Sequence, residues 1–296
     1  MFTIVASYPL VFCFLFCYYF YYFFHIGIII QEFQKNQNTF FNRGAFSYNL
    51  NMKIAFVSDI HSNIEAFSVA LDIIKHRKVD KIMSCGDIVG YGPDPEEAIT
   101  LFEENGIVGV RGNHDAGAVG DSILYEFNEY AKLALLYTKR NISKRSENFL
   151  KTLSTLIEED NFTIFHGFPN PKNPFKYILS DFDVIEAFSY LNTPIGFYGH
   201  THIPCVCKLS NENSPEVFPE QKQIKFKLEK GFRYLINVGS IGQPRDGNPK
   251  GAFVIFDTDE YSVEFVRFDY DVEKVYNKII ERNLPSYLGE RLFSGL

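Results

Sequence analysis

The chain has 296 residues, of which 46% are apolar and 22% charged, and its formal net charge is −7. This length and apolar content suit one large α/β domain or two small ones with a substantial core. Nucleic-acid binding surfaces need clustered Lys and Arg, so we expect no stable nucleic-acid binding. The five cysteines are too few for a disulfide scaffold, which favours a reducing, cytoplasmic location.

Residues 1–51 differ in composition from the rest of the chain. Residues 1–31 contain no Asp, Glu, Lys or Arg, and their apolar, aromatic run is long enough to span a bilayer. They lack the basic region and cleavage site of a secretory signal. One interpretation is a membrane anchor, for which Lys35 and Arg43 would keep the domain in the cytoplasm. The other is a dispensable leader or a mis-annotated start, because Met52 begins a strand pattern directly.

From Met52 the pattern alternates between short apolar strands and amphipathic helices, and we assign residues 52–296 to one domain. The predicted strands of its first part are residues 53–58, 81–85, 107–110, 161–165 and 195–198. The predicted helices are residues 64–74, 96–104 and 183–191, with a helical insertion at about 116–159. This alternation predicts βαβ units and a partly parallel sheet. The insertion is expected to border the site, and residues 168–177 to form a loop over it.

The last part of the domain has a different pattern. Four apolar runs follow one another with short turns, at residues 222–228, 234–238, 252–256 and 262–268. Consecutive strands of this kind predict a second, antiparallel-rich sheet. A helix over residues 272–282 is expected to close the domain.

Residue types that bind metals follow directly after several apolar runs. Asp59 and His61 come after the first strand, two residues apart, so extended backbone would send both side chains the same way. The other segments are Gly86-Asp87, Gly112-Asn-His-Asp115, His166-Gly167 and Gly199-His-Thr-His202. Five of the seven histidines lie in these segments. Open α/β sheets gather their chemistry at the ends of strands, so we expect the segments to meet.

This set suits a borderline-to-hard divalent ion without thiolate ligands. Seven ligands are too many for one ion, whereas two ions sharing a carboxylate would use them all. Taken alone, Asn113 could be a turn residue and His166 a core histidine. The Cys205-x-Cys207 pair has no second pair with which to close a zinc site. Arg245, with Gln243, either contacts phosphate or forms a structural salt bridge.

The ordered motifs D-x-H, GD, GNHD, HG and GHTH resemble the calcineurin-like metallophosphoesterase superfamily, in particular its small bacterial and archaeal phosphodiesterase and phosphatase branch. The resemblance covers about Met52 to Asp269, including the stretches 86–95 and 239–246. One departure is Val238, where the family usually has Pro. The resemblance implies an α/β (α+β) fold, a four-layer αββα sandwich of two mixed sheets flanked by helices.

The resemblance also implies a role for each site residue. One metal would be held by Asp59, His61, Asp87 and His202. The other would be held by Asp87, Asn113, His166 and His200, with Asp87 bridging the two. His114 would protonate the leaving oxygen, oriented by Asp115. Mn²⁺ is the first choice for the two divalent metal ions, with Fe, Zn, Ni and Co as alternatives.

These observations predict a hydrolase of phosphate esters, a phosphodiesterase or phosphatase with a dinuclear metal centre and a bridging hydroxide. Its partner would be a small phosphorylated substrate, with membrane contact only if residues 1–31 are an anchor. The alternatives are a protein serine/threonine phosphatase, a membrane-tethered regulator, or a non-catalytic protein-binding scaffold on the same fold. The presence of His114 argues against the scaffold, which needs no proton donor.

Overall fold

The structure is a computed structural model that describes residues 52–120, 127–209, 214–220 and 223–296. The predicted anchor or leader lies outside these residues. Among the described helices, none is both long and apolar enough to cross a membrane.

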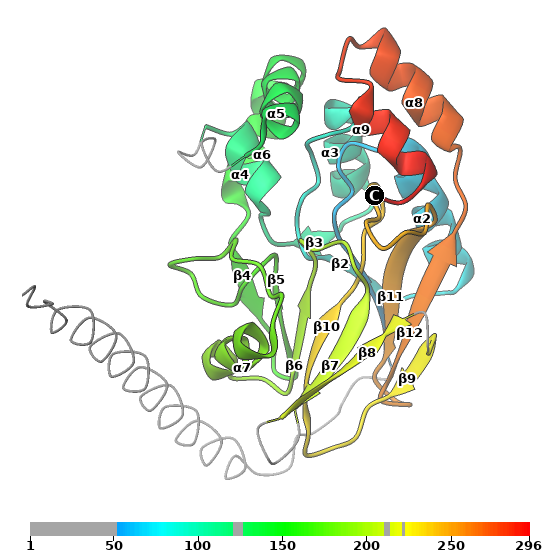
Figure 1. The fold of residues 1–296 in the computed structure, drawn as a ribbon. Coiled ribbons are helices and arrows are strands. Elements are labelled where there is room, and N and C mark those ends of the chain that lie inside the picture. Colours follow the sequence, from blue (N-terminus) through cyan, green and yellow to red (C-terminus); the bar gives the residue numbers. More distant parts are fainter. Residues whose placement is uncertain (1–51, 121–126, 210–213, 221–222) are drawn as a thin grey trace, which may run out of the picture. The chain divides into compact units, whose positions relative to one another are not determined.

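Two six-stranded mixed sheets form the centre of the domain (Figure 1). The first has the order β3-β2-β1-β11-β12-β9, with β1, β2 and β3 parallel and the remaining pairs antiparallel. Its strands are β1 (Lys53–Val57), β2 (Lys81–Ser84), β3 (Val108–Gly109), β9 (Lys225–Lys227), β11 (Gly251–Asp257) and β12 (Ser262–Phe268).

The second sheet has the order β4-β5-β6-β10-β7-β8, with β5, β6 and β10 parallel and the remaining pairs antiparallel. Its strands are β4 (Leu156–Glu158), β5 (Phe162–Phe165), β6 (Ile195–Tyr198), β7 (Cys205–Leu209), β8 (Pro215–Pro219) and β10 (Arg233–Asn237). The predicted fold of two mixed sheets flanked by helices is confirmed.

One part of the strand prediction is wrong. The last four predicted strands do not form a sheet of their own, because β9, β11 and β12 extend the first sheet while β10 joins the second. All five residues of β10 are buried, and the strand pairs in parallel with β6. A run of residues that is buried on both faces indicates a strand, but it does not indicate which strands pair with it. In addition, β4 lies inside the predicted helical insertion, and β8 was not predicted.

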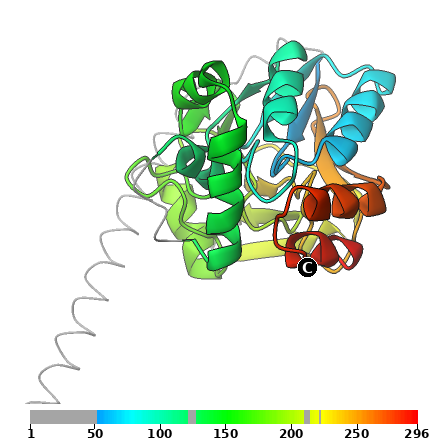
Figure 2. The same cartoon turned by 90° about the horizontal axis from the view of Figure 1, so that it is seen from above.

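Helices flank the two sheets (Figures 1 and 2). The helices are α2 (Ile64–His76), α3 (Pro95–Glu104), α4 (Asn113–Ala118), α5 (Glu129–Asn141), α6 (Lys144–Thr152), α7 (Asp181–Tyr190), α8 (Val272–Glu281), α9 (Tyr287–Glu290) and a 3₁₀ turn at Arg291–Phe293. The helix α2 packs on the first sheet and α7 on the second, and α5 and α8 pack on other helices. The side chain of Asn63 begins α2 by accepting the N–H of Ala66 at 3.0 Å, a cap typically worth about 1 kcal/mol.

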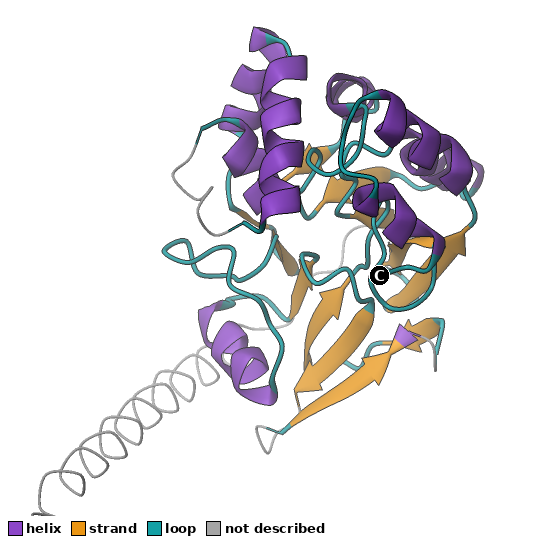
Figure 3. Cartoon of the chain, turned by 45° about the horizontal axis from the view of Figure 1, so that its top comes forward, coloured by secondary structure: helices purple, strands orange, loops and turns teal. Residues whose placement is uncertain are grey.

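Aromatic side chains fill the space between the sheets. Phe56 of β1 stacks on Phe197 of β6, with ring centroids 3.7 Å apart. Each is fully buried, and burying a Phe side chain contributes about 1.5–3 kcal/mol. This packing holds the two sheets face to face, so that the loops after their parallel strands meet at one edge. Figure 3 shows these loops gathered between the strands and the upper helices.

Candidate metal centre

Backbone hydrogen bonds join the loops that follow the central strands. The N–H of Asp59, after β1, donates to the carbonyl of Gly86, after β2, at 3.0 Å. The N–H of Gly199 donates to the carbonyl of His166 at 3.0 Å, and that of Ile241 donates across the sheets to Ser58 at 3.0 Å. The loops that carry the predicted ligands are therefore fixed to one another.

Most of the predicted ligands have left-handed backbone conformations. The φ angles are 53° at Asp59, 49° at His61, 56° at Asp87, 66° at His200 and 61° at His202. Non-glycine residues are uncommon in this region, and such strain concentrates at functional sites. These sharp turns direct the side chains back over the strand ends.

Asp59, His61 and His202 form a first buried group of metal-ligating atoms. The Nε2 atoms of His61 and His202 are 3.2 Å apart, and His202 Nε2 is 3.2 Å from Asp59 Oδ1. Bonds of about 2.0–2.2 Å to one ion place ligand atoms about 3 Å apart. Asp59 Oδ1 is buried and accepts no hydrogen bond from any residue that the structure describes. An oxygen of this kind fits a metal ligand.

Asp87, His166 and His200 form a second group, to which Asn113 adds an oxygen. His166 Nε2 lies 3.3 Å from Asp87 Oδ2, 3.0 Å from Asn113 Oδ1 and 3.0 Å from His200 Nδ1. All four side chains therefore present potential ligand atoms to one small region. The structure thus brings all seven predicted ligands together.

A single oxygen of Asp87 faces both groups. Its Oδ2 is 3.7 Å from His61 Nε2 and 3.3 Å from His166 Nε2. Its other oxygen accepts the backbone N–H of His114 at 2.8 Å. This hydrogen bond orients the carboxylate, so Oδ2 is the oxygen that a metal ion in either group could bind.

Backbone carbonyls fix the orientation of three imidazoles. The Nδ1 atoms of His61 and His166 lie 3.1 Å and 2.8 Å from the carbonyls of Val89 and Cys85, and His202 Nδ1 contacts the carbonyl of Gln243. A carbonyl only accepts, so each Nδ1 must donate, and each ring presents the Nε2 lone pair to the site when it is neutral. Metal-binding histidines typically have this arrangement.

Charges in the site favour ionised carboxylates. Burial raises the pKa of Asp59, but His202 and His166 outweigh it and lower the pKa to about 2. Burial lowers the pKa of His166, but Asp87 outweighs it and raises the pKa to about 9. Burial holds the pKa values of His61 and His200 well below the ordinary value. The latter two rings are therefore neutral and can bind a metal.

His114 lies within the site, in a group with His61 and Asp87. Burial lowers its pKa to about 4. Its ring is 4.7 Å from that of Phe127, and no hydrogen bond of Nδ1 to the described residues is found. The predicted leaving-group role therefore depends on a substrate that supplies the missing partner.

The contacts of Asp115 differ from those expected, because its carboxylate binds the backbone and not the ring of His114. It accepts N–H groups from Asp87 at 2.9 Å, Ile88 at 2.9 Å, Val89 at 3.1 Å and Gly112 at 3.0 Å. It thus joins the loop after β2 to the first turn of α4. In the sequence, only the adjacent His114 suggested a partner for the Asp115 carboxylate, and the four backbone N–H donors could not be predicted.

Two further positioning residues were missed. The amide of Asn237 donates to the carbonyl of Gly199 at 2.7 Å, and the hydroxyl of Ser240 donates to the carbonyl of Asp59 at 2.9 Å. Between them, the N–H of Val238 donates to the carbonyl of Tyr198 at 2.9 Å. Proline could not make this last bond, so the departure at 238 adds a link between β10 and β6.

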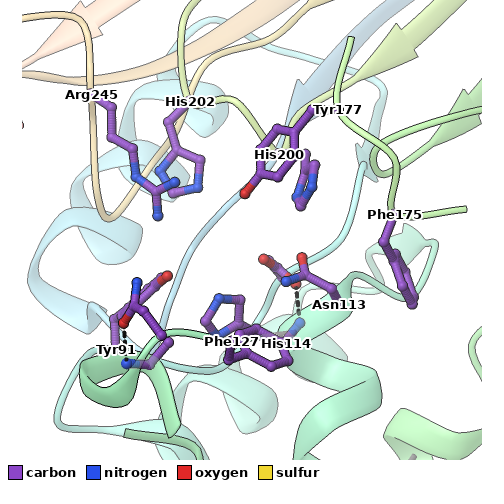
Figure 4. Close-up of a pocket in the computed structure, with 12 residues that line it drawn as sticks. Tyr91, Asn113, His114, Phe127, Phe175, Tyr177, His200, His202 and Arg245 are labelled. Atoms are coloured by element: carbon purple, nitrogen blue, oxygen red, sulfur yellow. Dashed lines mark hydrogen bonds between the residues drawn. The ribbon is translucent and has the colours of Figure 1, made fainter. Parts of the chain in front are cut away.

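A cavity of about 120 Å³ opens over the site (Figure 4). Beyond the predicted ligands, its walls are largely aromatic, from Tyr91, Phe127, Phe175 and Tyr177, with Arg245 at one side. Tyr177 stacks on His200 with ring centroids 3.8 Å apart. The predicted loop over the site thus supplies Phe175 and Tyr177, but their inward orientation could not be derived from sequence periodicity.

Comparisons with known proteins agree with this geometry. The sequence model of the calcineurin-like phosphoesterase superfamily domain matches residues 52–261. This chain belongs to the calcineurin-like phosphoesterase superfamily. An uncharacterised protein from Methanocaldococcus jannaschii is 42% identical over 246 residues, which cover 82% of this chain and 98% of that protein.

Solved structures of the superfamily fold are also similar. The metallophosphoesterase from Sphaerobacter thermophilus is 31% identical, with a TM-score of 0.70 over 83% of this chain and 99% of that one. A hypothetical protein from Pyrococcus horikoshii, 17% identical with a TM-score of 0.67 over 82% and 98% of the two chains, shares the fold. As a calcineurin-like phosphoesterase, the protein is a phosphoester hydrolase of a metal-dependent family, and its clustered ligand atoms fit that requirement.

Proposed function

We propose that the protein hydrolyses small phosphate esters at a centre of two divalent ions held by the seven predicted ligands. The observation that supports it most directly is Asp87 Oδ2, which faces His61 on one side and His166 on the other. Two bound ions would stabilise the charge of the phosphoryl group and lower the pKa of a water. Mn²⁺ is the first choice, and Fe, Zn, Ni and Co remain alternatives on ligand type.

The protein's own residues would exclude water and handle the leaving group. The rings of Tyr91 and Phe127 both pack against that of His114, with ring centroids 4.3 Å and 4.7 Å from its ring. They hold the imidazole beside the cavity. Because burial lowers its pKa to about 4, it would give a proton to the departing oxygen only in a substrate complex whose negative charge raises that pKa again. A proton donor of this kind typically contributes 10²–10⁴-fold to the rate.

The test is to titrate metal-free protein with Mn²⁺ while following metal content and the hydrolysis of p-nitrophenyl phosphate and bis(p-nitrophenyl) phosphate. We expect two equivalents of metal in the wild type, with hydrolysis of at least one ester. Asp87→Ala removes the shared oxygen, so both equivalents and turnover should be lost together. Asp72→Ala removes an exposed carboxylate of α2 and should retain both.

One full equivalent retained by Asp87→Ala would contradict the shared role of Asp87. Full turnover by metal-free wild-type protein would contradict the metal centre itself. Failure of the wild type to cleave any member of a panel of phosphate esters under several metals would instead favour the scaffold interpretation.

A further inference from the structure

Of the described residues that line the cavity, Arg245 is the one that carries a permanent positive charge. Its guanidinium lies beside His202 at one side of the open space (Figure 4), 5.6 Å from the ring centroid of Tyr91. The sequence leaves two roles open for this side chain, a contact with phosphate or a structural salt bridge. The residues around Arg245 distinguish between these roles.

The partner of Arg245 is neutral. Gln243 Oε1 accepts from Nε at 3.2 Å and from Nη2 at 2.7 Å. Among the described residues, no carboxylate oxygen lies within ion-pair distance of Arg245, whereas Arg267 close by contacts both Glu220 and Asp246. Structural arginines that are largely buried are normally paired with acids. Arg245 is instead held in place with its charge uncompensated.

Arg245 is positioned together with the predicted ligands. The loop that carries it also orients His202, through the carbonyl of Gln243. The cation and a predicted metal ligand are thus positioned by the same short segment.

We propose that Arg245 binds the second negative charge of a phosphoryl group, so that the enzyme prefers dianionic phosphate monoesters to monoanionic diesters. This inference rests on the hydrolase function proposed above. Bound metals would attract both ester classes, and an additional cation placed to meet a second phosphoryl charge would increase the preference for the dianionic one. A monoester carries a charge of about −1.5 to −2 at pH 7, and a guanidinium recognises two such oxygens with two parallel hydrogen bonds.

The test compares p-nitrophenyl phosphate with bis(p-nitrophenyl) phosphate, which share a leaving group. Arg245→Met should lower the ratio of kcat/KM for the monoester to that for the diester by about 10- to 100-fold, the range for hydrogen bonds to charged groups. Arg245→Lys keeps the positive charge but loses the guanidinium that can form two parallel hydrogen bonds. Its ratio should lie between those of the wild type and Arg245→Met. Arg77→Met removes a half-exposed, ion-paired charge at the end of α2 and should leave the ratio unchanged.

Two measurements do not depend on turnover. The Mn²⁺-loaded Arg245→Met variant should bind inorganic phosphate about tenfold or more weakly by calorimetry. Without phosphate, its thermal midpoint should equal or exceed that of the wild type, because an uncompensated cation is removed. Equal losses for both esters, unchanged phosphate affinity or a lowered midpoint would each overturn the role of Arg245. Failure of the wild type to cleave either ester would instead count against the hydrolase function, and the phosphate measurement would still decide the role of Arg245.

Discussion

Asp115→Asn should unfold more easily and lose metal, because the carboxylate of Asp115 holds two ligand loops together. The residue is fully buried, and its oxygens accept four backbone N–H groups. Asparagine can keep one oxygen toward Ile88 and Val89. Its NH₂ group would then face the N–H groups of Asp87 and Gly112, and both of these donors would lose their acceptor.

The size of the effect follows from these two bonds. A hydrogen bond to a charged group contributes about 1.5–3 kcal/mol, so losing two should lower the free energy of unfolding by about 3–6 kcal/mol. Domains are typically stable by about 5–15 kcal/mol. At about 2–4 °C per kcal/mol for a domain of this size, the thermal midpoint should fall by roughly 6–24 °C.

The assay is thermal unfolding of metal-free protein by circular dichroism, with metal content measured separately. Burial, with help from Asp87, raises the pKa of Asp115 to about 7, so the measurement belongs above that pH, where the carboxylate is ionised. The raised pKa means that this ionisation costs folding free energy, which Asp115→Asn removes, so the fall in the midpoint should lie toward the lower end of the range. Asp271→Asn is the matched control, because Asp271 also accepts a backbone N–H at a helix start, at 2.9 Å, but is exposed. Its midpoint should hardly change.

An unchanged midpoint and full metal content in Asp115→Asn, together with lost turnover, would refute this reasoning. That result would return Asp115 to the role expected from sequence, which is to orient the ring of His114.

Two further predictions concern the histidines. His114→Ala should lower turnover by about 10²–10⁴-fold while two equivalents of metal remain, as measured by elemental analysis; loss of metal would make His114 a ligand. Metal uptake should release a proton from His166, because Asp87 outweighs burial and raises its pKa to about 9, so the ring is protonated in the metal-free protein at neutral pH. Metal affinity should therefore rise with pH up to about 9 and level off above it. Calorimetry in buffers of different ionisation enthalpy will count the protons that are released. If no proton is released at pH 7, His166 is already neutral in the metal-free protein.

Local patterns predicted the parts of the fold that depend on neighbouring residues. The strands ending near Asp59 and Asp87 and the helix after Asn63 were predicted because apolar periodicity and capping residues act over a few positions. The partner of β10 was not, because a run buried on both faces carries no signal for its neighbours. The short strand β4 was hidden within a mostly helical stretch, because its three residues are not fully buried and are too few to show an apolar alternation.

The sequence by itself determined which chemical groups the candidate centre offers, because carboxylate, imidazole and amide groups are residue types, and their order after successive strands matches a known superfamily. Only the tertiary structure decided how these groups are supported. The N–H groups that Asp115 accepts from Asp87, Ile88 and Val89 come from a segment far from it in the chain, and so do the carbonyls of Gly199 and Asp59 to which Asn237 and Ser240 donate. Their contacts exist only after the two sheets pack and bring the strand ends to one edge.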